Sequence, residues 1–196
     1  MQDNRLIRQL EFLTEVDQLK SILRASRLAD NSRHENSAEH SWHVILCALV
    51  LADQAGPDVS IDRVIRMLIL HDIVEIDAGD APIHGTHDAE ALAAAEMAAA
   101  ERLFNILPTD QAADMRALWD EFEAAESADA IFAKSIDRVQ PLLLNLANGG
   151  GSWIDYNVSE AQIATRVGSK VAKGAPRLWE HMRARIAAFF AGSDTP

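Results

Sequence analysis

Apolar residues recur at intervals of three and four along most of this chain. The first such run consists of Leu6, Leu10, Leu13, Val16, Leu19 and Leu23. This spacing puts apolar side chains on one face of an α-helix, whereas a half-buried strand would alternate apolar with polar residues. No convincing run of alternation occurs, and alanine and leucine dominate the composition, which favours helices further. The sequence therefore predicts an all-α fold.

Start and stop signals divide the chain into about seven or eight helices. Asn36 or Ser37 is expected to cap the second helix, with Glu39 completing a capping box if Asn36 is the cap. The first expected helix is the leucine-spaced run up to Leu23; the second runs from Asn36 or Ser37 to about Gln54, and the third from Ser60 or Ile61 to Ile76. A fourth spans roughly 87–106, and a fifth starts at Pro108. The sixth runs from about Ser127 to the Gly149-Gly150-Gly151 stop, and the last two span 159–172 and 176–191. We expect one domain over residues 1–196, with core motifs at about 36–140 and C-terminal helices reaching about 191.

The formal net charge of −12 over 196 residues limits the possible partners. Proteins that follow a nucleic-acid backbone generally carry basic surfaces, so we expect no nucleic-acid polymer as the main partner. The longest apolar stretch, Val44 to Ala52, is far shorter than the roughly 20 residues of a membrane span, and the N-terminus lacks the apolar core of a signal peptide. The single cysteine, Cys47, is expected to be a buried, inert thiol. We therefore expect a soluble cytoplasmic protein with no membrane partner.

Positive charge is unevenly distributed along the sequence. Between Glu75 and Asp129 only Arg102 and Arg116 are basic, whereas the first seventy residues contain eight arginines and lysines. A small anionic substrate would be better received near that first portion of the chain. Most of these basic residues are nevertheless expected on solvated helix faces.

Residues that can bind a metal ion lie within apolar helices. Leu70-His71-Asp72 places an imidazole and a carboxylate in the middle of the third helix, and Asp137 lies among apolar neighbours in a later one. A buried carboxylate without a partner costs on the order of several kcal/mol, so such acids need a cation or many hydrogen bonds. A His-Asp pair alone is weak evidence, but His40, one turn into the second helix, adds another imidazole. Two imidazoles and two carboxylates suit a divalent ion such as Mn²⁺, Co²⁺, Fe²⁺, Ni²⁺ or Zn²⁺.

The strings ENSAEHSWH, HDIVEIDAGDAP, AKSIDRVQPLL and NGGGSW resemble the HD-domain metal phosphohydrolases, in particular their bacterial 5′-deoxynucleotidase branch. The resemblance covers roughly residues 5–170. It implies an all-α fold and, in many members, a homodimer. It also implies one divalent ion per chain (Mn, Co, Fe, Ni, Zn or Mg), held by His40, His71, Asp72 and Asp137. The four tryptophans are expected in the core or at a dimer interface: Trp42, Trp119, Trp153 and Trp179.

The resemblance further implies roles for residues beside these ligands. Glu75 matches a catalytic glutamate, and a carboxylate one turn from a metal ligand is well placed to transfer a proton. Asp80 matches a second catalytic-site residue that either orients water or binds the substrate sugar. Arg24 matches an arginine that binds phosphate, for which a planar guanidinium is suited. A tryptophan that usually follows this arginine is absent here, so base and sugar preference stay open and Arg27 is a candidate second phosphate contact.

Three further histidines lie near these motifs. His43 is expected to pack or to hydrogen-bond behind the ligands. His84 and His87 follow Asp80, and some HD enzymes use extra histidines to bind a second metal ion. The sequence leaves that alternative open.

These residues favour an enzyme over a binding protein. The leading hypothesis is a phosphomonoesterase acting on nucleoside 5′-monophosphates, deoxynucleotides above all, with Arg24 binding phosphate and Glu75 moving the proton. One alternative is an HD hydrolase of another phosphate ester, such as a dinucleotide or a modified nucleotide. Another is a non-catalytic sensor of metal or nucleotide, which would need neither Glu75 nor Asp80. A plain helical bundle would leave the buried acids and imidazoles unexplained.

Overall fold

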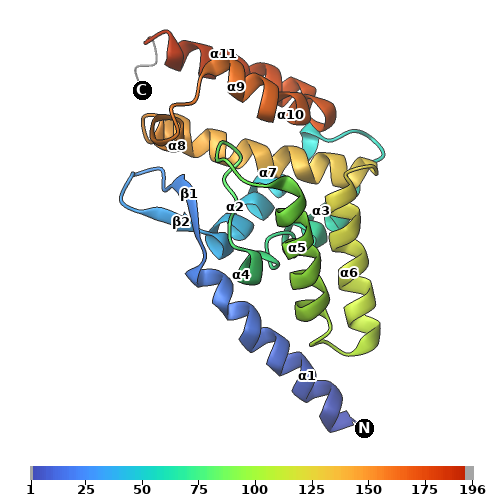
Figure 1. Ribbon diagram of the computed structural model, residues 1–196. Coiled ribbons are helices and arrows are strands. Elements are labelled where there is room, and N and C mark those ends of the chain that lie inside the picture. Colours follow the sequence, from blue (N-terminus) through green and yellow to red (C-terminus); the bar gives the residue numbers. More distant parts are fainter. Residues whose placement is uncertain (1, 193–196) are drawn as a thin grey trace.

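The computed structural model describes residues 2–192, with side chains from Asn4 onward, and confirms the all-α prediction (Figure 1). The α-helices are α1 (Gln2–Glu15), α2 (Ser37–Val50), α3 (Ile61–Leu68), α4 (Glu75–Ala78), α5 (Ala89–Phe104), α6 (Thr109–Ala124), α7 (Ala128–Ala147), α8 (Gly151–Asp155), α9 (Glu160–Ile163), α10 (Ser169–Gly174) and α11 (Pro176–Phe190). Two 3₁₀ helices, η1 (Val16–Ser21) and η2 (Ala52–Gln54), and one π-helical segment, η3 (Ala164–Gly168), join them. Among residues 2–192, no helix has both the length and the apolar character that crossing a membrane would require.

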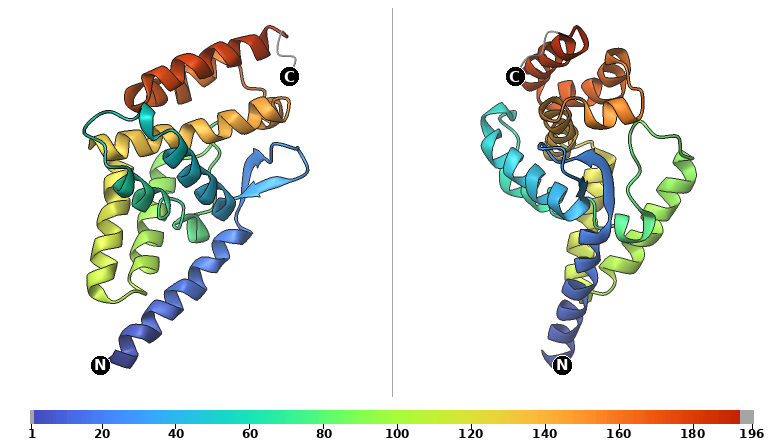
Figure 2. Two further views of the ribbon diagram at one scale, coloured as in Figure 1. Left: turned by 180° about the vertical axis from the view of Figure 1, so that it is seen from behind. Right: turned by 90° about the vertical axis from the view of Figure 1, so that its left-hand side faces the viewer.

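Helix α7 runs through the middle of the molecule (Figures 1 and 2). It packs against α2, α3 and α6 in the part that contains the N-terminus, and against α10 and α11 in the C-terminal layer. Helices α5 and α6 lie side by side, and α1 packs near the turn that joins them, where Arg8 Nε donates to the Ile106 carbonyl oxygen at 2.9 Å. Because α7 contacts both the helices of the N-terminal part and those of the C-terminal layer, its side chains can face a site between these two parts.

The buried apolar residues form two clusters. The larger cluster includes Val44 of α2 and Phe104 of α5, together with the predicted buried thiol of Cys47, whose pKa burial raises to about 11. The smaller cluster joins the second half of α7 to α8–α11 and includes Trp153 and Ile186. Burying one such large apolar side chain contributes roughly 1.5–3 kcal/mol, so each cluster stabilises its own part of the fold.

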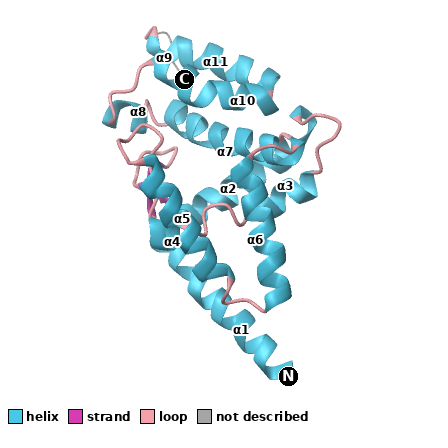
Figure 3. Cartoon of the chain, turned by 45° about the vertical axis from the view of Figure 1, so that its right-hand side comes forward, coloured by secondary structure: helices cyan, strands magenta, loops and turns pink. Residues whose placement is uncertain are grey.

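A short hairpin, whose strands are labelled in Figure 1 and coloured magenta in Figure 3, replaces the end of the predicted first helix. α1 ends at Glu15, and β1 (Leu23–Arg27) pairs antiparallel with β2 (His34–Asn36). Arg24 therefore lies on a strand and not, as predicted, at the end of a helix. Strand formation depends on the partner segment, and local helical spacing does not report a partner ten residues away. β2 thus lies in the segment between the first two expected helices.

The predicted start of the second helix is confirmed in detail. Asn36 Oδ1 accepts a hydrogen bond from the Glu39 backbone N–H at 3.0 Å, and the Glu39 carboxylate accepts one from the Asn36 N–H at 3.2 Å. This capping box satisfies two donors that the first turn of a helix leaves free. It therefore ties the end of β2 to the first turn of α2.

The predicted third helix is interrupted where the metal-ligand candidates lie. α3 ends at Leu68 and α4 begins at Glu75. Between them, the Ile73 N–H donates to the carbonyl three residues back, on Leu70, at 3.2 Å. Such bonding tightens the backbone into a 3₁₀-like turn, which a continuous apolar run does not reveal from sequence. His71 and Asp72 lie in this turn and not in the middle of a helix.

The C-terminal layer begins directly after the glycine run that ends α7. The predicted 159–172 helix is divided into α9, η3 and α10. α10 approaches α7 closely at Gly174, where a Cβ atom would collide with Ser135 Oγ and the Ile131 backbone. Glycine at this position therefore allows α10 to pack closely against α7.

Candidate active site

Three segments distant in the sequence bring the four candidate ligands together. His40 comes from α2, His71 and Asp72 from the turn after α3, and Asp137 from α7. Asp137 Oδ1 lies 3.0 Å from His40 Nε2 and 3.7 Å from His71 Nε2. Donor atoms of the buried residues His40, His71 and Asp72 all lie within 4.8 Å of one another. This mixture of imidazole nitrogens and carboxylate oxygens is a donor set for a divalent transition-metal ion.

Gln140 orients His40 from behind, one turn after Asp137 on α7. Its Oε1 lies 3.0 Å from His40 Nδ1, and its Nε2 lies 2.7 Å from Glu35 Oε1 and 2.9 Å from His43 Nδ1. Because the amide N–H groups donate to Glu35 and His43, the amide oxygen accepts from His40 Nδ1–H. The other nitrogen, Nε2, then directs its lone pair toward the candidate ligands. His43 thus hydrogen-bonds behind the ligands, as predicted.

His71 is oriented by the turn that carries it. Its Nδ1 lies 2.7 Å from the Leu68 carbonyl oxygen, its own carbonyl accepts from Trp119 Nε1 at 3.3 Å, and its ring meets Phe122 edge-on. His71 Nε2 is buried and has no hydrogen-bond partner in the described part of the chain. A buried nitrogen without a partner needs an explanation, and here it lies 3.0 Å from the carboxylate of Asp72. These residues therefore fit a bound cation.

The electrostatics of the cluster agree with this fit. Burial lowers the pKa of His40, and Arg24 acts in the same direction, but Asp137 and Glu35 outweigh them and raise it to about 9. Burial raises the pKa of Asp137, but the neighbouring imidazoles of His40 and His71 hold it well below its usual value. With no ion bound, the surrounding carboxylates favour the protonated form of His40, so the site attracts positive charge, and a metal ion would take the place of the proton on Nε2. A divalent ion supplies such charge.

Arg24 points into the same cluster from β1. One terminal nitrogen lies 2.8 Å from Asp72 Oδ2, 3.4 Å from Glu75 Oε1 and 3.3 Å from Asp80 Oδ1. Burial lowers the pKa of the guanidinium, but these three carboxylates raise it overall, so Arg24 stays charged. Its buried Nε has no hydrogen-bond partner among the described residues and keeps a free donor.

Two carboxyl groups beside the candidate ligands have raised pKa values. Glu75 accepts a hydrogen bond from Ser37 Oγ at 2.5 Å. Burial and then Asp72 raise the pKa of Glu75 to about 9, against the opposing effect of Arg24. Burial also raises the pKa of Asp80, with Asp72 adding to it and Arg24 opposing it. A carboxyl group whose pKa is raised toward neutrality can hold and release a proton during a reaction.

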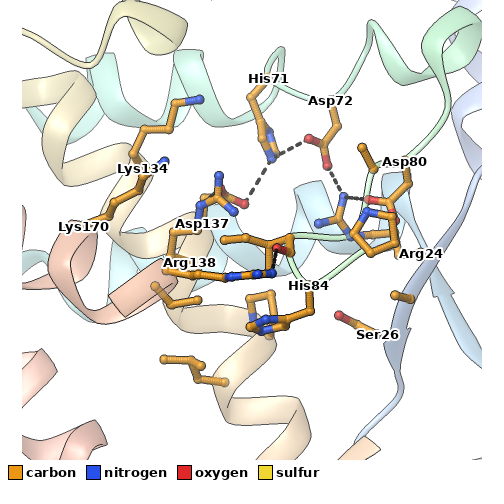
Figure 4. A pocket seen from close by; sticks show the side chains of 18 of the residues that line it. Arg24, Ser26, His71, Asp72, Asp80, His84, Lys134, Asp137, Arg138 and Lys170 are labelled. Atoms are coloured by element: carbon orange, nitrogen blue, oxygen red, sulfur yellow. Dashed lines mark hydrogen bonds and ion pairs between the residues drawn. The ribbon is translucent and has the colours of Figure 1, made fainter. Parts of the chain in front are cut away.

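One open cleft of about 960 Å³ is bordered by six of these groups: Arg24, His71, Asp72, Glu75, Asp80 and Asp137. His40 lies fully buried behind them. That volume lies in the range of cofactor and small-molecule sites. Figure 4 shows His71 and Asp72 above the cleft, Arg24 and Asp80 on one side, and Lys134 and Lys170 on the other. Aromatic side chains also line it, among them Trp153 and Tyr156. The cleft therefore presents acidic, basic and aromatic groups to one ligand.

Three of the predicted site residues lie apart from the cluster. Arg27 is not among the lining residues, and its Nε lies 3.6 Å from Asp155 Oδ2. The structure therefore does not bring Arg27 to the cleft. His84 and His87 do line it, but neither belongs to a group of potential metal ligands among residues 4–192. A second metal ion at these histidines has no support.

Sequence reasoning missed other residues of the site. Gln140 follows Asp137 by three positions, so helical spacing could have placed both on one face. Glu35, only 2% exposed, lies in β2, between the first two expected helices, where sequence pattern gave no sign of burial. Of the arginines and lysines in the first seventy residues, only Arg24 lines the cleft, and the other arginines and lysines that line it lie after position 130.

Comparisons with known proteins place the chain in a family. The profile of the HD domain matches residues 16–179. The chain is 30% identical to the 5′-deoxynucleotidase HDDC2 of Bos taurus (78% of this chain, 76% of that protein) and 32% identical to the 5′-deoxynucleotidase plu3092 of Photorhabdus laumondii (78% and 80%). It also resembles the crystal structure of a "predicted metal-dependent phosphohydrolase" from Magnetospirillum magnetotacticum MS-1, with a TM-score of 0.90 and 46% identity over 98% of this chain and 100% of that one. The chain belongs to the HD-domain family of metal-dependent phosphohydrolases.

Proposed function

We propose that this chain is a 5′-nucleotidase that releases phosphate from nucleoside 5′-monophosphates, with deoxynucleotides preferred. The observation that carries the proposal is that two imidazoles, two carboxylates and the Arg24 guanidinium meet in one cluster at the cleft. The names of the two 5′-deoxynucleotidase relatives support the substrate class.

In this proposal His40, His71, Asp72 and Asp137 hold one divalent ion, with Mn, Co, Fe, Ni, Zn and Mg as candidates. When bound, such an ion neutralises charge on a phosphate oxygen and lowers the pKa of water. The orphaned Nε2 of His71 and the Nε2 of His40 supply the nitrogen donors. Binding a cation here also relieves the repulsion among the buried carboxylates.

The remaining residues act on the phosphate and the proton. Arg24 binds the phosphate oxygens, because its free Nε and terminal nitrogens form a planar fork. Glu75, held by Ser37, transfers the proton to the leaving oxygen or takes it from water. Asp80 orients water or the substrate sugar from the other side of Arg24.

A non-catalytic sensor could use the same ligands but would not need the two further acids. Burying carboxyl groups destabilises a fold unless they are paired. Glu75 is only 9% exposed and lies with Asp80 at the cluster. A site that retains both acids is better suited to proton transfer than to sensing.

The test is phosphate release from a panel of nucleotides with a panel of divalent ions. Asp137→Ala should lose the ion in elemental analysis and lose activity, whereas Asp155→Ala, outside the cleft, should keep both. Glu75→Gln should keep metal and nucleotide binding while kcat falls by roughly 10²–10⁴. If no 5′-monophosphate is hydrolysed with any ion, the proposed function is wrong. Full metal content in Asp137→Ala would remove Asp137 from the ligand set.

We also propose that the protein forms a homodimer through exposed apolar faces. Helices α1 and α2 expose large apolar side chains at helical spacing: Leu6, Leu10, Leu13, Trp42, Leu46 and Leu49. Large apolar side chains exposed on helix faces can mark interaction sites. Light scattering should give twice the chain mass, and Trp42→Glu combined with Leu49→Glu should give monomers. A wild-type monomer at micromolar concentration would contradict the proposal.

A further inference from the structure

Basic side chains gather on one side of the cleft. Of the chain's four lysines, three line it, and two arginines of the same region join them: Lys134, Arg138, Arg166, Lys170 and Lys173. We call these five residues the cationic wall. They belong to α7, η3 and α10, which pack together, and Figure 4 shows Lys134 and Lys170 lying side by side. In a chain of net charge −12, composition does not account for this concentration.

Only two members of the cationic wall have acidic partners among the described residues. Lys134 Nζ lies 2.8 Å from Glu123 Oε1 and 4.0 Å from the centre of a phenylalanine ring. Arg138 Nε lies 3.6 Å from Asp137 Oδ2. Asp137 is shared with the two imidazoles and, in the proposed function, with the metal ion. Its charge is therefore not free to neutralise Arg138.

The other three members have no ion pair within residues 4–192. Arg166 donates to a backbone carbonyl at 3.2 Å, which leaves its charge uncompensated. Lys170 and Lys173 form no ion pair with described residues. The pKa of Lys170 is lowered, first by Arg138, then by burial and by Lys134, so these cations lie close enough to repel one another. Such repulsion destabilises the fold unless an anion occupies the space between them.

We infer that the cationic wall binds a second phosphoryl group of the substrate, beside the phosphate that is released. The inference rests on the proposed function and extends its substrate class from 5′-monophosphates to nucleotides that carry a second phosphoryl group. Arg24 and the candidate metal ligands account for one phosphate, and they come from β1, α2, the turn after α3 and α7. Lys170 and Lys173 come from α10, which carries none of those residues.

The reach of the cationic wall agrees with one ligand that contacts both ends of the cleft. Arg138 follows Asp137 directly in the sequence, so the cationic wall begins next to the reaction centre. From there it continues along α10 inside the same cleft of about 960 Å³. The second phosphoryl group has two chemical sources, a 3′-phosphate on the sugar or a second phosphate in a 5′-diphosphate. Both present a dianion that ammonium and guanidinium groups bind.

The test compares deoxyadenosine 5′-monophosphate, 3′,5′-bisphosphate and 5′-diphosphate. Dissociation constants are measured by calorimetry on the full metal-loaded chain in a Glu75→Gln background, where turnover is slow. A second phosphate should tighten binding by roughly tenfold or more relative to the monophosphate. If the bisphosphate binds more tightly, the second phosphoryl group is a 3′-phosphate; if the diphosphate does, it belongs to a 5′-diphosphate. Lys170→Ala should remove most of this gain, Lys170→Arg should retain it, and Lys170→Ala with Lys173→Ala should abolish it.

The matched control is Lys20→Ala, which removes the one lysine outside the cleft, where it pairs with Asp17. Its gain from the second phosphate should equal that of the parent protein. Equal affinity of the parent protein for all three compounds would overturn the inference. It would also be overturned if Lys170→Ala weakened the binding of all three compounds by the same factor. Monophosphate hydrolysis with either of those results leaves the proposed function intact. A Lys170-dependent gain without hydrolysis of any nucleotide supports the inference and refutes the proposed function.

Discussion

Gln140 offers a sharp test of how the candidate metal site is organised. It is fully buried and contacts three groups at once: the Nδ1 of His40 at 3.0 Å, Glu35 at 2.7 Å and His43 at 2.9 Å. Leucine has a similar volume but no hydrogen-bonding atoms. Gln140→Leu therefore removes the acceptor that selects the His40 tautomer and the donor that satisfies Glu35, while leaving the four candidate ligands unchanged.

Two magnitudes follow from these contacts. Loss of a hydrogen bond behind a metal ligand weakens metal binding by about 10–100-fold, or roughly 1.4–2.7 kcal/mol. Separately, the Glu35 carboxylate loses the donor to its Oε1, and its Oε2, which lies 3.6 Å from His40 Nδ1, already has no hydrogen-bond partner among the described residues. An unsatisfied buried polar group costs about 1–3 kcal/mol, so the metal-free variant should unfold at lower temperature.

The assay separates these two effects with a second variant. Metal affinity is measured by competition with a chromogenic chelator, and stability by thermal denaturation of the metal-free protein. Gln140→Leu combined with Glu35→Leu removes both hydrogen-bonding partners and should recover most of the stability but none of the metal affinity. Wild-type metal affinity in Gln140→Leu would refute the reasoning. Recovery of metal affinity in the double variant would show that Gln140 acts only through stability.

Three further predictions concern other residues. Because burial and Asp72 raise the pKa of Glu75 from 4.5 to about 9, its ionisation destabilises the metal-free fold as pH rises through that interval. The melting temperature of the metal-free protein should therefore fall less between pH 5 and pH 9 in Glu75→Gln than in the wild type. The same fall with pH in both proteins would contradict this. Arg24→Ala should cost about 1.5–3 kcal/mol in kcat/KM for every accepted nucleotide, with partial recovery in Arg24→Lys, and a loss confined to one base would exclude a phosphate contact. Gly174→Ala should lower the melting temperature, because its Cβ would collide with Ser135 and the α7 backbone, whereas Gly56→Ala, with open space around it, should not.

Local signals predicted the helical segments well where the interactions are themselves local. The Asn36–Glu39 capping box spans four residues, and Ser127 caps α7 by accepting from the Ala130 N–H. Each of these pairings is visible in a short window of sequence. The glycine run after α7 works in the same way, because positive φ angles at Gly149 and Gly150 end the helix wherever it packs.

The sequence did not reveal features that depend on distant contacts. β1 forms because β2 pairs with it, and the turn at His71 and Asp72 lies inside an apolar run that reads as continuous helix. Gln140 and Glu35 are separated by 105 residues and meet only in the folded chain. The four proposed ligands could be named from residue type and resemblance. The hydrogen bonds that orient these ligands, and the cationic wall, could not be predicted from sequence, because both depend on how α7 packs against its neighbours.

The division of the core into two apolar clusters bears on how the protein opens in solution. The candidate metal ligands lie with the larger cluster, whereas most of the cationic wall belongs to the layer stabilised by the smaller one. Segments with separate cores exchange their amide protons as separate cooperative units. Transient detachment of α8–α11 would therefore uncover the cleft while the imidazoles and carboxylates stay assembled. Amide exchange should be faster in α10 than in α3, and a ligand that bridges the two sides should slow exchange in α10 most.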